Sequence, residues 1–181
     1  MKKIIIIILT IFFSNSLKAN ERDNQLNKLF EELKVDNYKI TQEIEQKIWN
    51  IWSTHPTDKN LTEILGRGSK LVREQELVQA FDVFTRVIEL DPNWAEAWNK
   101  RATVLYLMGK HEMSQADIDK VLDIEKRHFG ALTGQGLVQT ALENYEKAID
   151  SYVEAHKVHP YMKSPMIMIE KLMLQLQKQS I

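Results

Sequence analysis

The 181-residue sequence contains no cysteine, and it is also poor in glycine and proline. The missing cysteines exclude disulfide bonds, thiolate metal sites and a cysteine nucleophile. The 6 glycines and 4 prolines are too few for a turn-rich, all-β fold. The formal net charge of -1 gives the whole chain none of the basic character that is typical of nucleic-acid-binding proteins. What is present, 44% hydrophobic and 27% charged residues, is typical of a globular protein.

The N-terminal segment has the pattern of an export signal. Lys2 and Lys3 precede an apolar run over residues 4–13, and the small Ala19 suits cleavage before Asn20. As a helix, a run of about ten residues spans only about half of the apolar core of a bilayer. We therefore expect residues 1–19 to be a cleaved signal peptide and the mature protein to be periplasmic in a Gram-negative cell. An uncleaved N-terminal membrane anchor is the alternative. Cleavage would leave 21 basic and 25 acidic residues.

Residues 20–60 are predicted to form a helical cap at the N-terminal side. Leu26, Leu29, Phe30 and Leu33 recur at the i, i+3, i+4, i+7 spacing of one helix face. A second amphipathic stretch has its apolar face on Thr41, Ile44, Ile48, Ile51 and Trp52. Asp36 and Asn37 interrupt the two stretches, and Pro56 ends the second. Since no segment alternates between apolar and polar residues as a strand does, the predicted fold class is all-α.

From Leu61 onward, the sequence repeats itself every 34 residues. Small residues recur at two positions, as Gly68, Ala102 and Gly136 and as Ala80, Ser114 and Ala148. Bulky residues recur at two others, as Ile64, Trp98 and Leu132 and as Phe84, Ile118 and Tyr152. Small residues let two helices approach closely and bulky residues fill the space beside them. Each copy is therefore predicted to be an antiparallel helix pair.

These positions resemble the pattern of the tetratricopeptide-repeat family. The copies are residues 61–94, 95–128 and 129–162, and Ser114, Lys126 and Gln139 depart from the family pattern. The resemblance implies an α-α superhelix of three helix-turn-helix repeats, with residues 20–60 and 163–181 as helical caps. The segments around Trp98 and Phe129 also look like those of exported, mainly proteobacterial members of the family, whose roles are mostly unassigned.

The common motifs of catalytic and cofactor sites are missing from the sequence. Gly66-Arg67-Gly68 and Gly134-Gln135-Gly136 lack the further glycine and lysine of phosphate-binding loops. His156 and His159 share a helix face, but no acid-rich partner motif accompanies them, and an exposed helix end is the expected setting. We expect no enzyme activity, no catalytic or metal-binding residue, no cofactor and no nucleic-acid partner. Contact with a membrane is expected only through the N-terminal signal or anchor.

The predicted partner is a protein or a peptide. In the family, the first helix of each copy lines a concave face that contacts peptide ligands. Carried over to this sequence, the candidate contact residues are Asn99, Lys100, Thr103, Tyr106 and Arg73. His128, in the turn between the second and third copies, is a further candidate. Asn99 suits a peptide backbone, Lys100 suits a carboxylate and Tyr106 offers a large amphipathic surface. One family subset grips a C-terminal carboxylate with Lys and Asn, but the matching positions of the first copy are Leu65 and Ser69. No such clamp is expected.

Self-association is the alternative to capture of a separate partner. Ile169, Leu172, Met173 and Leu176 form an apolar helix face at the C-terminal side. This face suits a cap on the third copy, and a homodimer would instead bury Ile169, Leu172 and Leu176 between two chains. Trp94, at the turn between the first two copies, is a further candidate for an exposed interface residue.

Overall fold

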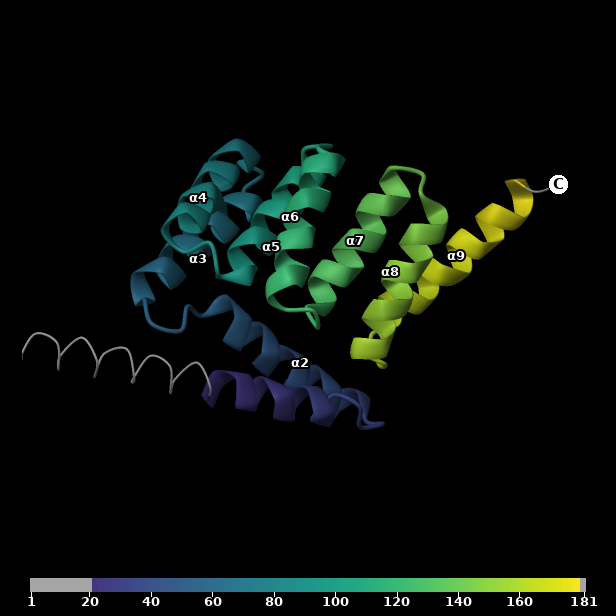
Figure 1. Cartoon of the computed structure of the whole chain (residues 1–181), viewed down its shortest axis with the longest axis horizontal. Helices are drawn as coiled ribbons and strands as arrows, with labels where there is room; N and C mark the ends of the chain where they lie inside the picture. The colour runs from purple at the N-terminus through teal and green to yellow at the C-terminus, as the bar shows by residue number, and fades with distance from the viewer. Residues whose placement is uncertain (1–20, 180–181) are drawn as a thin grey trace, which may run out of the picture. The chain divides into compact units, whose positions relative to one another are not determined.

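The computed structural model describes residues 21–179, and all regular secondary structure in this range is helical (Figure 1). The predicted all-α fold class is confirmed. The chain divides into two compact units, one up to Thr62 and one from Glu63 onward. The expected signal peptide, residues 1–19, lies outside the described residues. Between residues 21 and 179, no helix is both long and apolar enough to cross a membrane.

The first unit consists mainly of two helices that bury the apolar faces predicted from the sequence. One helix covers residues 21–32, and the other is α2 (Tyr38–Ser53). The buried residues of the two helices and their junction are Leu26, Leu29, Phe30, Leu33, Thr41, Ile44, Ile48 and Trp52. Asn37 starts α2, because its side chain accepts a hydrogen bond from the backbone N–H of Ile40 at 3.2 Å. That these helices cap the first copy stays a prediction.

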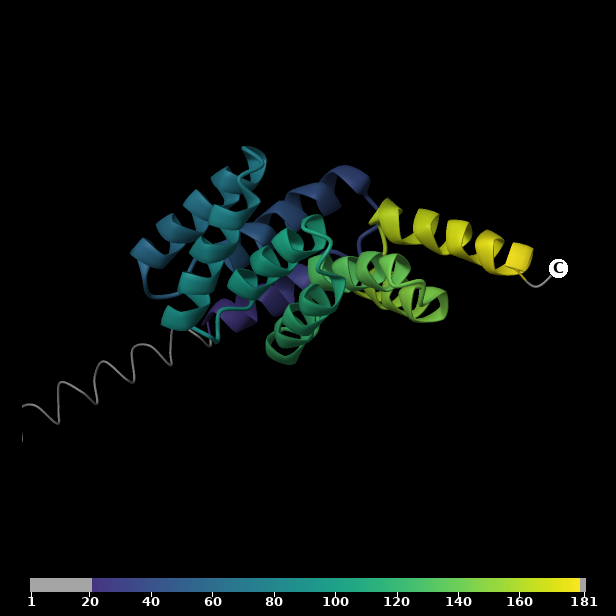
Figure 2. The ribbon, with the colours of Figure 1, turned by 90° about the horizontal axis from the view of Figure 1, so that it is seen from above.

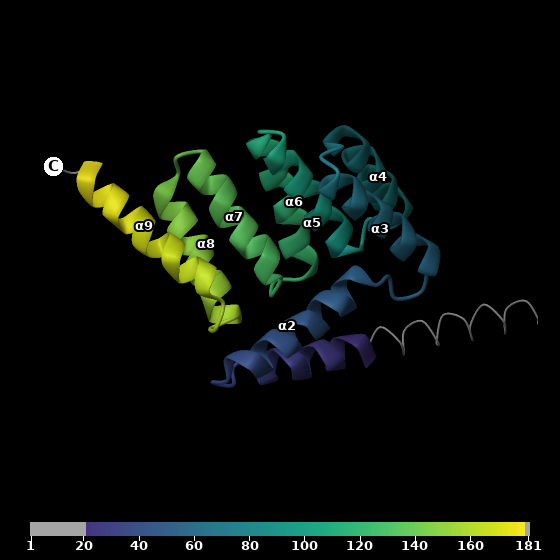
Figure 3. The same cartoon turned by 180° about the vertical axis from the view of Figure 1, so that it is seen from behind.

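The second unit is a row of antiparallel helix pairs, seen from opposite sides in Figures 1 and 3. The pairs are α3 (Lys59–Arg73) with α4 (Leu77–Leu90), α5 (Ala95–Leu107) with α6 (His111–Ile124), and α7 (Phe129–Ala141) with α8 (Tyr145–Val158). Helix α9 (Lys163–Gln179) continues the row beyond α8, as Figure 2 shows from above. The second helices begin at Leu77, His111 and Tyr145, which confirms the 34-residue period of the sequence.

Within each pair, the chain reverses through a residue with left-handed backbone geometry. Gln75, Gly109 and Glu143 have φ angles of 65°, 71° and 59°. The residue after each of them donates its N–H to a carbonyl five residues back, at 2.8–2.9 Å, which closes the first helix as a Schellman motif. Of the three residue types, only glycine adopts this conformation without steric cost.

In the first and third pairs, glycine is required where the two helices touch. A Cβ atom at Gly68 would lie 2.5 Å from the ring of Phe84, and one at Gly136 would lie 2.5 Å from the ring of Tyr152. In the middle copy, Ser114 stands where the family pattern has a smaller apolar residue. Its Oγ donates to the carbonyl of Ala102 at 2.8 Å, so the buried hydroxyl is satisfied.

The turns between copies keep one geometry with or without proline. Asp91, Glu125 and His159 each donate the backbone N–H to a carbonyl four residues earlier, at 2.8–2.9 Å. Lys126 therefore replaces the proline without changing the turn. The expectation that His159 lies at an exposed helix end is wrong, because it is buried and its ring centroid lies 5.3 Å from that of Phe129.

Helix α9 buries its predicted apolar face only in part. Ile169 and Leu172 are buried in a cluster with Ala148 and Tyr152 of α8. Met173, predicted on the same face, is 59% exposed, because a single neighbouring helix covers only a narrow stripe of α9. Since Ile169 and Leu172 already contact α8, they are not available for the homodimer contact considered from the sequence.

Candidate protein-binding groove

A small hollow of about 70 Å³ opens between α5, α6 and α7. Residues of all three helices line it: Asn99, Ala102, Thr103, Tyr106, Ser114, Ile118, Gly130, Gly134, Leu137 and Val138. None of these side chains carries a charge. Three of the predicted contact residues, Asn99, Thr103 and Tyr106, therefore come together at one site. The other three, Lys100, Arg73 and His128, do not line it.

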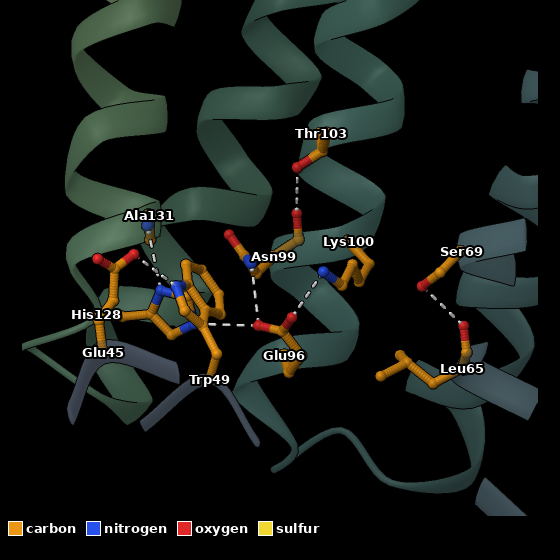
Figure 4. A network of polar contacts seen from close by, with 10 residues as sticks. All are labelled: Glu45, Trp49, Leu65, Ser69, Glu96, Asn99, Lys100, Thr103, His128 and Ala131. Carbon is orange, nitrogen blue, oxygen red and sulfur yellow. Dashed lines mark hydrogen bonds and ion pairs between the residues drawn. The ribbon is translucent and has the colours of Figure 1, made fainter. Parts of the chain in front are cut away.

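The α5 wall of the hollow is held by polar contacts around Glu96 (Figure 4). Asn99 Nδ2 donates to Glu96 Oε2 at 2.9 Å, and Lys100 Nζ lies 2.9 Å from Oε1. His128 Nε2 lies 3.1 Å from Oε2, while His128 Nδ1 accepts a hydrogen bond from the N–H of Ala131 at 3.1 Å. Because Nδ1 is an acceptor, the ring proton sits on Nε2 and points at the carboxylate.

Glu96 is 1% exposed, yet it is held in its ionised form. Burial alone would raise the pKa of Glu96, but the hydrogen bond from His128 and the charge of Lys100 outweigh burial and hold this pKa below its usual value. The carboxylate thus joins the start of α5 to the start of α7. It fixes the Asn99 amide with its nitrogen toward Glu96.

This network corrects the role predicted for His128 and gives Lys100 a partner within the protein. His128 is fully buried and caps α7, so the prediction that it contacts a partner is wrong. Lys100 is paired inside the protein, and its charge is already compensated by Glu96. The i, i+4 spacing of Glu96 and Lys100 is a sequence signal for that pair. No sequence signal joins Glu96 to His128, which is 32 residues away.

The remaining predicted residues lie on accessible surface. Thr103 is exposed, and its Oγ1 donates to the carbonyl of Asn99 at 3.0 Å. Tyr106 is half-buried, with its ring centroid 5.4 Å from that of His111. Arg73 is exposed at the end of α3. Their contact with a partner stays a prediction. Trp94, considered as an exposed interface residue, is only 4% exposed, so that expectation is wrong.

Arg101, for which the sequence predicted no role, ties three helices together. Its guanidinium donates twice to the carboxylate of Asp117 on α6, both at 2.7 Å, and once to Thr85 Oγ1 on α4 at 3.2 Å. The guanidinium carbon also lies 4.9 Å from the ring centroid of Trp98. The repeat register is the sequence signal that could have indicated the pair of Arg101 and Asp117. The equivalent residues of the next copy, Gln135 and Ser151, are also hydrogen-bonded to each other.

The walls of the hollow offer apolar surface and an amide, which are suited to binding another molecule. Within residues 21–179, no three His, Asp or Glu side chains gather in a way that could hold a metal ion.

The model of the tetratricopeptide-repeat family matches residues 95–128, the same residues as the predicted second copy. Residues 95–128 are therefore identified as a tetratricopeptide repeat. A TPR repeat-containing protein of Rhizobium etli is 38% identical over 92 residues, which cover 47% of this chain and 45% of that protein. The chain spans less than half the length of the curated relatives that it matches.

Solved structures share the fold at low sequence identity. The first TPR domain of Spaghetti (RPAP3), bound to the HSP90 peptide SRMEEVD, has a TM-score of 0.63 and 18% identity, over 65% of this chain and 93% of that chain. SycD, a type III secretion chaperone of Yersinia enterocolitica in complex with a peptide of the translocator YopD, has a TM-score of 0.61 and 10% identity, over 66% and 96%. The superhelical solenoid predicted from the sequence is confirmed.

Proposed function

We propose that this tetratricopeptide-repeat protein is a non-catalytic adaptor that binds a protein or peptide segment in the hollow between α5, α6 and α7. One observation carries the proposal: Asn99, Thr103 and Tyr106 line a single hollow opposite a wall from α7. Because Asn99 Nδ2 is bound to Glu96, its Oδ1 is left as an acceptor at the wall, and a peptide N–H is a suitable donor. Tyr106 and Leu137 add apolar contact area.

The bound peptides of the Spaghetti domain and of SycD support a peptide as the ligand class. Recognition of a terminal carboxylate is not part of the proposal. Ser69, at a clamp position of the first copy, donates its hydroxyl to the carbonyl of Leu65 at 3.1 Å (Figure 4). On α7, the groove positions are Gly130 and Gly134, which carry no cation.

Capture from native cells with matched variants tests the adaptor function. The full chain is cross-linked in its own cells and purified as wild type, as Leu137→Glu and as Met113→Glu. Leu137 lines the hollow, whereas Met113 is an exposed apolar residue of α6 outside it. The proposal expects one or more proteins that wild type and Met113→Glu capture equally and that Leu137→Glu loses. Equal capture by all three proteins would count against the hollow as the binding site.

The proposal includes export, which rests on the sequence of residues 1–19. Fractionation of the source cells, followed by N-terminal sequencing of the purified protein, tests it. A periplasmic protein that begins at Asn20 is expected. An intact N-terminus in the cytoplasmic or membrane fraction would refute cleavage and periplasmic location.

A further inference from the structure

Gly134 lies in the interior of α7, faces the hollow and is not needed for helix packing. A Cβ atom there would meet only Ile118 Cδ1 at 3.6 Å, an ordinary van der Waals distance. At Gly136, two residues later, a Cβ atom would collide with Tyr152 at 2.5 Å. Glycine is among the least favourable residues in a helix interior. At Gly134, therefore, the missing side chain is not required by packing and leaves the hollow open.

The interior of the hollow is neutral and largely apolar. Ile118 and Val138 contribute apolar side chains to it. The hydroxyls of Thr103 and Ser114 donate to backbone carbonyls at 3.0 and 2.8 Å, so their protons are already used. The Oδ1 of Asn99 is a further acceptor at the wall, on a side chain that is only 8% exposed and is fixed through its nitrogen. The hollow thus offers acceptor oxygens, Asn99 Oδ1 among them, beside an uncharged space.

We infer that Gly134 opens a pocket for one aliphatic side chain of a bound peptide, whose backbone N–H donates to Asn99. This inference rests on the proposed function and adds the chemistry of the ligand. An enclosed apolar cavity of roughly 150 Å³ is known to bind benzene. The hollow has about 70 Å³, so Val, Leu, Ile or Met fits better than an aromatic residue. Acidic side chains are disfavoured, because no lining residue is a cation.

Thermal unfolding separates the pocket from a packing role. Gly134→Ala is expected to leave the melting temperature unchanged or raise it, since the added methyl group has room and alanine favours the helix. Gly136→Ala is expected to lower it, because the methyl group would overlap Tyr152. A lower melting temperature for Gly134→Ala would mean that packing explains this glycine, and the inference would be wrong.

Selection of phage-displayed random peptides on the full chain then tests the ligand chemistry. Wild-type protein is expected to enrich peptides that share an aliphatic residue at one position. Gly134→Leu, which fills the hollow, is expected to bind a synthetic copy of the enriched peptide at least tenfold more weakly. Gly66→Leu is the control, because Gly66 occupies the same repeat position in α3, has nothing within 4 Å of its Cβ position and does not line the hollow. Its affinity is expected to stay within about twofold.

The outcomes distinguish this inference from the proposed function. If wild type enriches no peptide, both the proposed function and the inference fail. If wild type enriches peptides without a shared aliphatic position, the adaptor function stands and the inference is overturned. Equal binding by Gly134→Leu and wild type would also overturn it. Gly134→Ala repeats the binding measurement with a smaller loss expected, in case Gly134→Leu does not fold by circular dichroism.

Discussion

At the scale of single residues, Glu96 is the carboxylate on which the joint between the second and third copies depends. Its pKa lies below the usual value, so the ionised form is more favourable in the folded chain than in the unfolded chain. Glu96→Gln removes the charge and is expected to cost about 2 kcal/mol of unfolding free energy at pH 7. Urea unfolding of wild type and Glu96→Gln at pH 7, repeated at lower pH, measures this contribution.

The pH dependence of this difference has a defined direction. The stabilisation by Glu96 is complete above its usual pKa and is lost as the pH falls from that value toward the lower pKa of the folded state. The stability gap between wild type and Glu96→Gln should therefore narrow below about pH 4.5. A gap that is independent of pH would show that Glu96 does not act through its charge.

Arg101 and Asp117 form a second residue-scale link, across α5 and α6. Arg101→Ala leaves the carboxylate of Asp117, which is 5% exposed, without two hydrogen bonds and should cost about 3 kcal/mol in urea unfolding. Arg101→Lys should rescue little of this loss, because an ammonium group cannot donate in the same two-pronged geometry. The double variant Arg101→Ala with Asp117→Ala should be more stable than Arg101→Ala alone. Strict additivity of the two substitutions would contradict a direct interaction.

These contacts between single residues could be predicted from the sequence only in part. Asn99, Thr103 and Tyr106 could be assigned to one site because the repeat register fixes which helix face they occupy. Lys100 shares that register, but its partner Glu96 is specific to the second copy, and a family pattern does not encode it. The burial of His128 depends on tertiary contacts that periodicity alone does not predict.

At the scale of helices, a turn inside a pair costs conformational free energy where a residue other than glycine adopts the left-handed geometry. Glu143 holds a left-handed φ of 59°, and its side chain is exposed. Glu143→Gly should raise the unfolding free energy by about 1 kcal/mol, because glycine has no Cβ to clash in this conformation. Gly109→Ala, at the equivalent turn of the second copy, should lower it by a similar amount. Thermal unfolding of both variants checks the prediction, and a destabilised Glu143→Gly would contradict it.

Helix boundaries were the most predictable feature, and helix faces at the edge of the row the least. The 34-residue period predicts where α4, α6 and α8 begin. The period can be recognised in the sequence because Gly68 and Gly136 must be small where they contact aromatic rings. In α9, the apolar pattern predicted Met173 on the buried side, but only residues facing α8 find a neighbour. A pattern identifies an amphipathic helix, whereas the number of its neighbours decides how wide the buried stripe is.

At the scale of the whole repeat unit, the stability of each copy is expected to depend on its contacts with the neighbouring copies. Each helix from α4 to α9 contacts the next in the row, so each copy relies mainly on the copies beside it. The hollow belongs to α5, α6 and α7 and therefore spans a boundary between copies. Any loosening of the third copy should reach the proposed binding site through α7.

Leu172→Ala tests this coupling at a distance from the hollow. Leu172 is 2% exposed and packs on α8, so the truncation should cost about 3 kcal/mol locally. Amide hydrogen exchange is then expected to speed up by roughly 100-fold in α7, α8 and α9, with a smaller change in α5 and α6. Leu174→Ala, on the exposed side of the same helix, is the control and should leave exchange unchanged. An equal change in every helix from α4 to α9 would mean that the unit unfolds as one block. In that case, the hollow would depend on the stability of the whole row rather than on the adjacent copies.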